Sequence, residues 1–280
     1  GLEYDSYPSE YEAVFSSNTS QKAYEEDVLL AGFGAAPTKN EGASVSYDDA
    51  GQQWTARYQH ETVALAFSIT EEAEEDGQYG SIASRYTKAL ARSMSSTKEI
   101  KAANVLNNAT SANGGDGTTL LSTAHPTQNG NQSNTLATAA DLSETSLESI
   151  LIQIADMKDE RGLRVAAQGT QLIIPTAYTF VAERLLESQL RTGTADNDIN
   201  AIKSGGYLPK GYHVMRRLTD ADQFFVQTDV PDGLKYFTRS AMKKGMEGDF
   251  ETGNIRYKCR ERYSFGFTDW RGIFGSEGAA

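Results

Sequence analysis

The stretch "NIRYKCRERYSFGFTDWRGIFG", which starts at Asn254, alternates two kinds of side chain. Aromatic and aliphatic residues hold one set of positions, with Glu261 as the exception. The cations on the other set are Arg256, Lys258, Arg260 and Arg262, which we call the comb. Because successive side chains of a strand point to opposite faces, this spacing predicts a long strand with one cationic and one mostly apolar face. The fold must therefore supply an apolar layer on one side only.

The comb belongs to a strongly acidic chain of 280 residues with a net charge of −12. Residues 1–76 contain 16 acidic and 3 basic side chains, whereas residues 77–280 contain 22 acidic and 23 basic ones. Opposite charges a few ångströms apart attract by roughly 1–4 kcal/mol, depending on exposure. We expect the comb to bind carboxylates of the first quarter, and the alternative is that the acidic quarter is only a solvated face. The second interpretation of the comb is a sheet face stabilised within the subunit. Nucleic acid ranks third, because phosphate binding depends on the number of cations and weakens with salt.

The first 70 residues indicate an extended arm followed by a hairpin. Residues 1–42 mix aromatic, polar and Gly or Pro residues without a sustained period, which favours an arm. Residues 43–70 alternate around the turn-forming "DDAGQQ", with apolar residues at Val63, Leu65 and Phe67. The returning strand is predicted from Ala56 to Ile69, about 46 Å at roughly 3.3 Å per residue. Since a lone hairpin is marginal in water, we expect it to project and to be supported by another subunit.

Later segments predict one long helix and a compact α/β lobe. The period over residues 78–108 is helical, which gives a rod of roughly 45 Å. Arg85, Lys88 and Arg92 form a cationic stripe along it. Residues 141–161 form an amphipathic pattern, "TQLIIP" is typical of a buried strand, and "PTAYTFVAERLLESQ" of a second helix. The length exceeds what one core usually serves, so we expect about two lobes of an α+β fold.

Motifs that carry chemistry are missing from the sequence. There is no phosphate-binding loop, no dinucleotide fingerprint and no nucleophile elbow, so we expect no catalytic residue, no cofactor and no metal. Cys259 is the single cysteine and is predicted to be a buried structural thiol. The "EEAEED" cluster at residues 71–76 favours a helix N-terminus over an acid–base site, and His125 precedes a proline in a loop. No apolar run approaches the roughly 20 residues that span a bilayer, so no membrane is expected.

Several motifs resemble one family over nearly the whole chain from about residue 20. They include "YEEDVLLAGFGAAPTKNEG", "RYTKALARSM", "LIIPTAYTFVAERLL" and "MEGDFETGNIRYKCRERYSFGFTDWRGIFG". These resemble the major capsid proteins of tailed bacteriophages, most closely the Mu-like major head subunit. The resemblance implies the Hong Kong 97 fold. Its parts would be an N-terminal arm (1–42), an E-loop hairpin (43–76), a peripheral domain with a long spine helix (77–140 and 235–280) and an axial domain (141–234).

The resemblance also implies a function. The chain would be a structural subunit of an icosahedral head, not an enzyme, which self-assembles in the host cytoplasm into pentamers and hexamers around double-stranded DNA. Its partners would be itself, the portal, and possibly scaffolding or decoration proteins, with no sequence-specific DNA binding. Some relatives join subunits covalently through a Lys on the E-loop; since no Lys lies between Ala43 and Asp76, we expect no such bond. The alternatives are an encapsulin-like cargo compartment and a soluble carboxylate-based enzyme.

We expect the contacts between subunits to use the apolar face of the hairpin, the stripe on the long helix and the comb. The residues are Val63, Leu65, Phe67, Arg85, Lys88, Arg92, Arg256, Lys258, Arg260 and Arg262.

Overall fold

The computed structural model describes residues 8–75, 79–190, 199–249, 251 and 253–279. The chain divides into two compact units, each assembled from three separate stretches. The first unit comprises residues 1–25, 58–104 and 235–266, and the second comprises residues 26–57, 105–234 and 267–280. Each unit combines helix with sheet, so the α+β prediction is confirmed.

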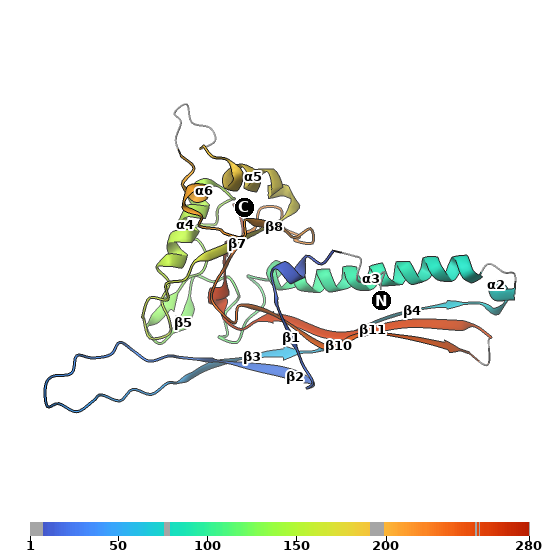
Figure 1. Ribbon diagram of the computed structural model, residues 1–280, viewed down its shortest axis with the longest axis horizontal. Helices are drawn as coiled ribbons and strands as arrows, with labels where there is room; N and C mark the ends of the chain where they lie inside the picture. Colours follow the sequence, from blue (N-terminus) through green and yellow to red (C-terminus); the bar gives the residue numbers. More distant parts are fainter. Residues whose placement is uncertain (1–7, 76–78, 191–198, 250, 252, 280) are drawn as a thin grey trace. The chain divides into compact units, whose positions relative to one another are not determined.

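The first unit is a four-stranded sheet with one long helix on one face. The strand order is β1-β10-β11-β4. Its elements are β1 (Ser16–Thr19), β4 (Glu61–Ile69), α3 (Tyr79–Asn107), β10 (Leu234–Gly248) and β11 (Ile255–Phe267). Figure 1 shows α3 running along β4, β10 and β11. The predicted rod and the predicted comb strand are therefore present, as α3 and β11. A short helix α2 (Glu71–Glu75) precedes α3.

The helix and the sheet join through a small apolar cluster. Leu90 and Met94 of α3 and Cys259 of β11 are buried together, and Met242 of β10 packs against them. Cys259 is the buried structural thiol that the sequence predicts, and burial raises the pKa of its thiol. The alternation of β11 thus turns its odd-numbered residues toward α3 and its even-numbered residues away.

The N-terminal segment packs on its own chain, which corrects part of the predicted arm. A 3-10 turn, η1 (Tyr11–Ala13), is followed by β1, which pairs in parallel with β10. The rings of Tyr11 and Phe15 both pack against the ring of Phe265, with ring centres 5.4 Å and 5.2 Å apart, respectively. Glu99 of α3 accepts hydrogen bonds from the backbone N–H groups of Glu10 (2.8 Å) and Tyr11 (3.2 Å). Aromatic residues that look irregular in sequence are thus core residues of the first unit.

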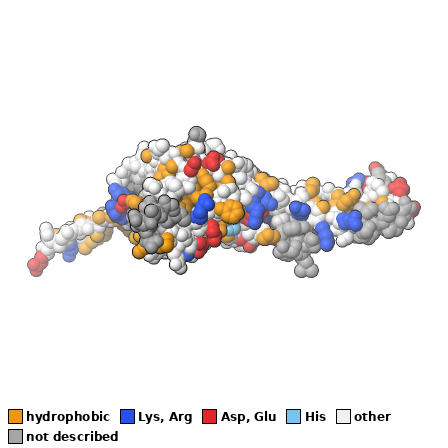
Figure 2. Space-filling view, turned by 90° about the horizontal axis from the view of Figure 1, so that it is seen from above, with side chains coloured by type: hydrophobic (Ala, Val, Ile, Leu, Met, Phe, Trp, Pro, Cys, Tyr) orange, Lys and Arg blue, Asp and Glu red, His pale blue; other side chains and the backbone are white. Residues whose placement is uncertain are grey.

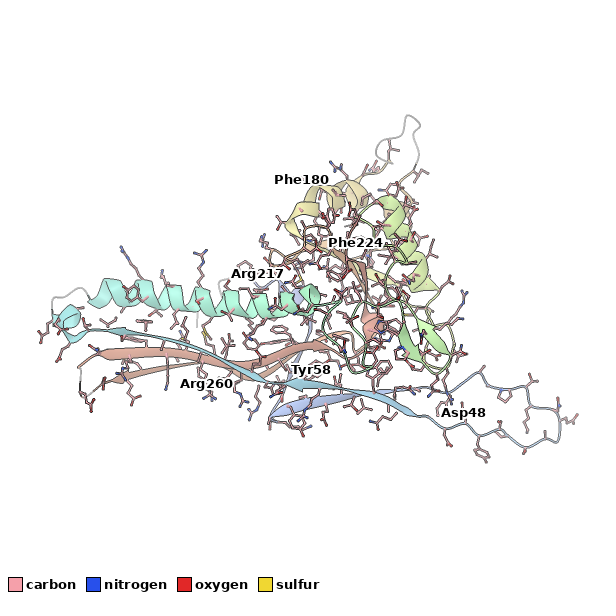
Figure 3. All side chains as sticks on the ribbon, turned by 180° about the vertical axis from the view of Figure 1, so that it is seen from behind. Asp48, Tyr58, Phe180, Arg217, Phe224 and Arg260 are labelled. Atoms are coloured by element: carbon pink, nitrogen blue, oxygen red, sulfur yellow. The ribbon has the colours of Figure 1, made fainter. Side chains whose placement is uncertain are left out.

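The second unit is built on another four-stranded sheet, in the order β12-β9-β7-β8. Most residues of the two central strands are buried, among them Phe224, which is labelled in Figure 3. The strands are β7 (Gly169–Ile174), β8 (Tyr212–Val214), β9 (Phe224–Thr228) and β12 (Ile273–Ser276). The helices are α4 (Glu144–Ala155), α5 (Thr179–Glu187) and α6 (Ala201–Gly205), with the 3-10 turns η2 (Thr176–Tyr178) and η3 (Trp270–Gly272). A small hairpin joins β5 (His125–Thr127) to β6 (Gly130–Gln132).

The predicted hairpin is wrong in its pairing. The strand predicted from Ala56 to Ile69 is split at His60 into β3 (Gln52–Gln59) and β4. β3 pairs with β2 (Tyr24–Leu30), whereas β4 pairs with β11 over nine residues. Residues 31–51 lie between β2 and β3 and form no strand (Figure 1). The alternation of β4 reflects one face packed on α3, and the strand that partners β3 lies in the stretch predicted to be an arm.

The different position of the loop removes the argument against a covalent bond between subunits through a loop lysine. That argument counted lysines between residues 43 and 76, but the loop between β2 and β3 covers residues 31–51 and includes Lys39. The absence of a lysine therefore no longer holds for the observed loop.

The boundaries of the two units also differ from the predicted domains. Residues 105–140 and 267–280 group with residues 141–234 instead of with the sheet that carries the comb. Long-range pairing explains the difference. β12 pairs with β9, and the buried Asn134 amide donates to the carbonyl oxygens of Leu120 (2.6 Å) and Ile273 (2.9 Å). No local sequence pattern indicates these contacts.

Candidate assembly surfaces

The comb lies on the face of the first unit's sheet that α3 leaves uncovered. Arg256, Lys258 and Arg260 are exposed and Arg262 is half-buried, and Figure 3 shows Arg260 pointing away from α3. Opposite them on β4 stand small residues, since Arg260 is in register with Ala64. The cations therefore stand beside small side chains of β4 that do not cover them. The predicted cationic face is thus present and exposed in the described part of the chain.

One comb residue already has a carboxylate partner inside the unit. Arg256 forms an ion pair with Asp249, which stands in the turn between β10 and β11. On the neighbouring strand, a Cβ on Gly245 would lie 3.1 Å from Lys258 Cε, so Gly245 leaves room for the lysine stem on this face. The comb is thus partly a surface stabilised within the subunit, which was the second of the sequence-based interpretations.

Glu261, the exception in the alternating pattern, forms an ion pair with a buried lysine. Its carboxylate lies 3.7 Å from Lys98 Nζ, and the two side chains are 3% and 11% exposed. The ammonium of Lys98 also lies 4.9–5.4 Å from the ring centres of Tyr236, Tyr11 and Tyr263. Burial raises the pKa of Tyr263, and the nearby Glu261 carboxylate adds to the effect. The acid on the apolar face therefore neutralises a cation that α3 brings into the core.

The apolar residues predicted on the hairpin lie instead on β4. Val63 and Phe67 pack against the cluster of Leu90, Met94 and Cys259, so they are half-buried within their own subunit. Phe67 stacks on Tyr257 with ring centres 5.0 Å apart. Leu65 remains 46% exposed. Of the three, Leu65 offers the most apolar surface to a partner.

The stripe on α3 is exposed on the side of the helix away from the sheet. Arg85, Lys88 and Arg92 all have exposed side chains. A shallow groove beside Lys88 and Arg92 continues along Ser96 to Ile100. Figure 2 looks onto this side of the molecule and shows Lys and Arg side chains spread along it. The structure therefore presents two separate cationic surfaces on the first unit, one on the helix and one on the sheet.

The loop of residues 31–51 exposes apolar side chains. Val45 and Tyr47 are exposed, the latter to 96%. The base of the loop is held within the second unit, since Arg161 binds the Asp48 carboxylate at 2.6 Å. Asp48 also accepts from the Gly34 N–H at 2.8 Å, and this bond holds the pKa of the carboxyl below its usual value. The loop thus combines a base fixed by an ion pair with exposed apolar side chains.

A buried polar network in the second unit was not recognised from the sequence. His125 is fully buried, stacks on Trp270 with ring centres 4.2 Å apart, and contacts Asp116 at 2.6 Å. Arg271, whose guanidinium lies 4.3 Å from the Trp270 ring centre, binds Glu160 at 2.7 Å and Asp269 at 3.3 Å. Burial raises the pKa values of Glu160 and Asp269 in spite of the arginine.

These groups offer no site for a reaction, because they are closed off from solvent and bind one another. The described residues contain no group of three or more His, Cys, Asp or Glu side chains placed to hold a metal ion. Of the acidic cluster at residues 71–76, Glu72 and Glu75 are exposed at the sheet's far end. Within the described ranges, no helix combines the length and the apolar character needed to cross a bilayer.

The chain belongs to the phage capsid protein family, whose members are shell-forming proteins. The model of that family, described as "Phage capsid protein", matches residues 52–275. The chain is thus a structural subunit of a phage head and not an enzyme. Its place is the capsid of the virion, where copies associate with one another into a shell. No curated protein sequence matches the chain.

Solved structures of similar fold are capsids and capsid-like particles. A structure named for Mycobacterium phage Adephagia has a TM-score of 0.60 at 10% identity, covering 98% of this chain and 91% of that one. The bacteriophage JBD30 capsid gives 0.53 at 12% identity, covering 98% and 67%. A virus-like particle from Pyrococcus furiosus gives 0.55 at 11% identity, covering 98% and 94%.

These matches confirm the Hong Kong 97 fold. The fold is shared with a virus-like particle, but the family match is to phage capsids, so the encapsulin-like alternative has less support. The carboxylate-enzyme alternative has none. The Mu-like subtype stays a prediction.

Proposed function

We propose that copies of this chain form rings of five and six that close into an icosahedral shell around a double-stranded DNA genome. The observation that carries the proposal is the loop of residues 31–51, which is anchored at its base and leaves Tyr47 almost fully exposed. Exposed aromatic side chains on an anchored segment gain most of their burial from a neighbouring molecule. Repetition of such a contact around a shell strengthens each modest interaction.

The two cationic surfaces are proposed as docks for acidic segments of adjacent copies. The comb offers four cations, of which Arg256 also pairs with Asp249, and the stripe of Arg85, Lys88 and Arg92 offers three more. Leu65, in register with Cys259, adds exposed apolar surface on the other face of the sheet. Residues 1–76 carry the opposing charge. DNA would be enclosed without sequence-specific contacts, since an acidic protein adds little to phosphate binding. We further propose that the shell assembles in the host cytoplasm, and that its other partners are the portal and possibly scaffolding or decoration proteins.

Loop substitutions test the proposal. The full chain, purified and concentrated, is expected to form closed particles by electron microscopy and light scattering. Tyr47→Ser should lower the yield of particles without changing the melting temperature of the unassembled subunit, because Tyr47 buries almost nothing there. Ser46→Ala, at the exposed neighbouring position, is the matched control. A chain that stays monomeric at every concentration would contradict the proposal.

Charge reversal tests the comb separately. Arg260→Glu combined with Arg262→Glu should reduce assembly at low salt and less so at high salt, because salt screens exposed charges beyond about 8–10 Å. Particles that form normally at both salt concentrations would remove the comb from the assembly contacts while leaving the loop's role intact.

A further inference from the structure

A projecting apolar residue and an apolar groove lie on different flanks of the second unit. Phe180, near the start of α5, is 77% exposed. The groove lies between α4 and α6 and is lined by Leu151, Ile152, Ala155, Ile202 and Tyr207. In Figure 1, α5 lies to one side of the sheet and α4 to the other, and Figure 3 shows Phe180 on the side away from α4. Phe180 therefore cannot fill the groove of its own copy.

The groove has the size and lining for a phenyl ring. Its volume is about 340 Å³, and roughly 150 Å³ of apolar cavity suffices to hold a benzene molecule. Ile152, which is 64% exposed, forms one wall. Because Phe180 of the same copy lies on the other flank, a phenylalanine ring that fills the groove has to come from a second copy.

Phe180 and the groove residue Ile152 each have a charged residue one helical turn away, and the two charges are opposite. Arg184 follows Phe180 by four residues on α5, and Glu148 precedes Ile152 by four residues on α4 and lines the groove. Within the described part of the chain, neither charged side chain has an ion-pair partner. Residues four apart stand on one helical face, separated by about 6 Å along the axis.

The equal spacing makes both contacts possible at once. If α5 of one copy lies antiparallel to α4 of the next, Phe180 meets Ile152 while Arg184 meets Glu148. The parallel arrangement would place the arginine on the isoleucine instead. The order of charge and apolar residue on the two helices thus selects one orientation.

We propose that Phe180 and Arg184 of one copy dock onto Ile152 and Glu148 of the next, forming the head-to-tail contact within each ring. This inference rests on the proposed function, since it names the surfaces by which the rings form. A contact between two different surfaces of identical chains is heterologous, and it closes into a ring when the rotation per copy allows it. Placement on different flanks is the condition for such a contact.

Charge swapping tests the orientation in the full-length protein. Arg184→Glu and Glu148→Arg should each raise the protein concentration needed for assembly at least about tenfold, because like charges then oppose each other across the contact. The double variant keeps the wild-type net charge and should return to within about threefold of the wild type, since it restores the pair in reverse. Two impaired single variants without rescue in the double, or unimpaired single variants, would overturn the contact.

Cross-linking tests the contact even if no shell forms. Phe180→Cys combined with Ile152→Cys, treated with a mild oxidant such as diamide, should give a ladder of disulfide-linked chains ending at five or six. Either cysteine alone should give at most dimers, and the native Cys259 is buried. A ladder without shells would support the contact and refute the proposed shell. Shells without a ladder would assign the groove to another occupant and overturn the contact.

Discussion

The buried pair of Lys98 and Glu261 permits a quantitative prediction. Replacing Glu261 by leucine removes the carboxylate 3.7 Å from Lys98 Nζ and leaves the ammonium 11% exposed among three tyrosine rings. Removing one partner of a buried pair costs about 3–5 kcal/mol. Each ring can attract a desolvated cation by up to about 2 kcal/mol, and these attractions remain, so we expect the lower end. The free energy of unfolding should fall by about 3 kcal/mol.

The measurement is urea unfolding of unassembled subunits, followed by circular dichroism at a concentration too low for shells. The dependence on urea should keep its slope, which indicates an unchanged native fold. The matched control is Glu261→Leu together with Lys98→Met, which replaces the pair by apolar side chains and should recover most of the loss. A single variant that loses less than about 1 kcal/mol, or a double variant as unstable as the single one, would refute the reasoning.

Three further predictions concern stability. Burial alone would raise the pKa of Asp116, but hydrogen bonds from His125 and Thr118 outweigh it and hold that pKa below its usual value. The stability difference between wild type and Asp116→Asn should therefore be full above about pH 4 and disappear as the pH falls further, as measured by unfolding at each pH. Gly233→Ala should cost about 1–3 kcal/mol in a thermal melt, because its Cβ would lie 2.9 Å from the Gly272 backbone, whereas Gly32→Ala has no atom within 4 Å and should be neutral. Glu99→Ala removes two acceptors of N-terminal N–H groups and should speed proteolysis near residue 10 with only a small change in melting temperature; an unchanged cleavage rate would contradict it.

The sequence allowed the regular elements of both units to be predicted wherever one period extended over many residues. The helical pattern of residues 78–108 corresponds to α3, and the alternation from Ile255 to Phe267 corresponds to β11. Both patterns are local consequences of one buried face, so they can be recognised without knowing the partner.

Pairing between distant strands could not be predicted in the same way. The alternation of residues 61–69 is equally compatible with a hairpin strand and with an edge strand beside β11, and only the fold decides between them. Similarly, Glu261 looks like a defect in the alternating pattern of β11. Its partner Lys98 lies 163 positions away, so the ion pair that explains it cannot be recognised from the local sequence. The placement of Phe180 and the groove is likewise a property of the folded unit.

The single thiol of the chain can be used to measure opening of the first unit. Cys259 is enclosed between β11 and α3, beside Leu90 and Met94. A thiol reagent can react with it only after the helix has lifted from the strands, so the rate of labelling measures how often that opening occurs. The labelling rate of free subunits and of finished particles can therefore be compared without introducing a probe, and the ratio gives the degree to which enclosure in a particle restrains the helix.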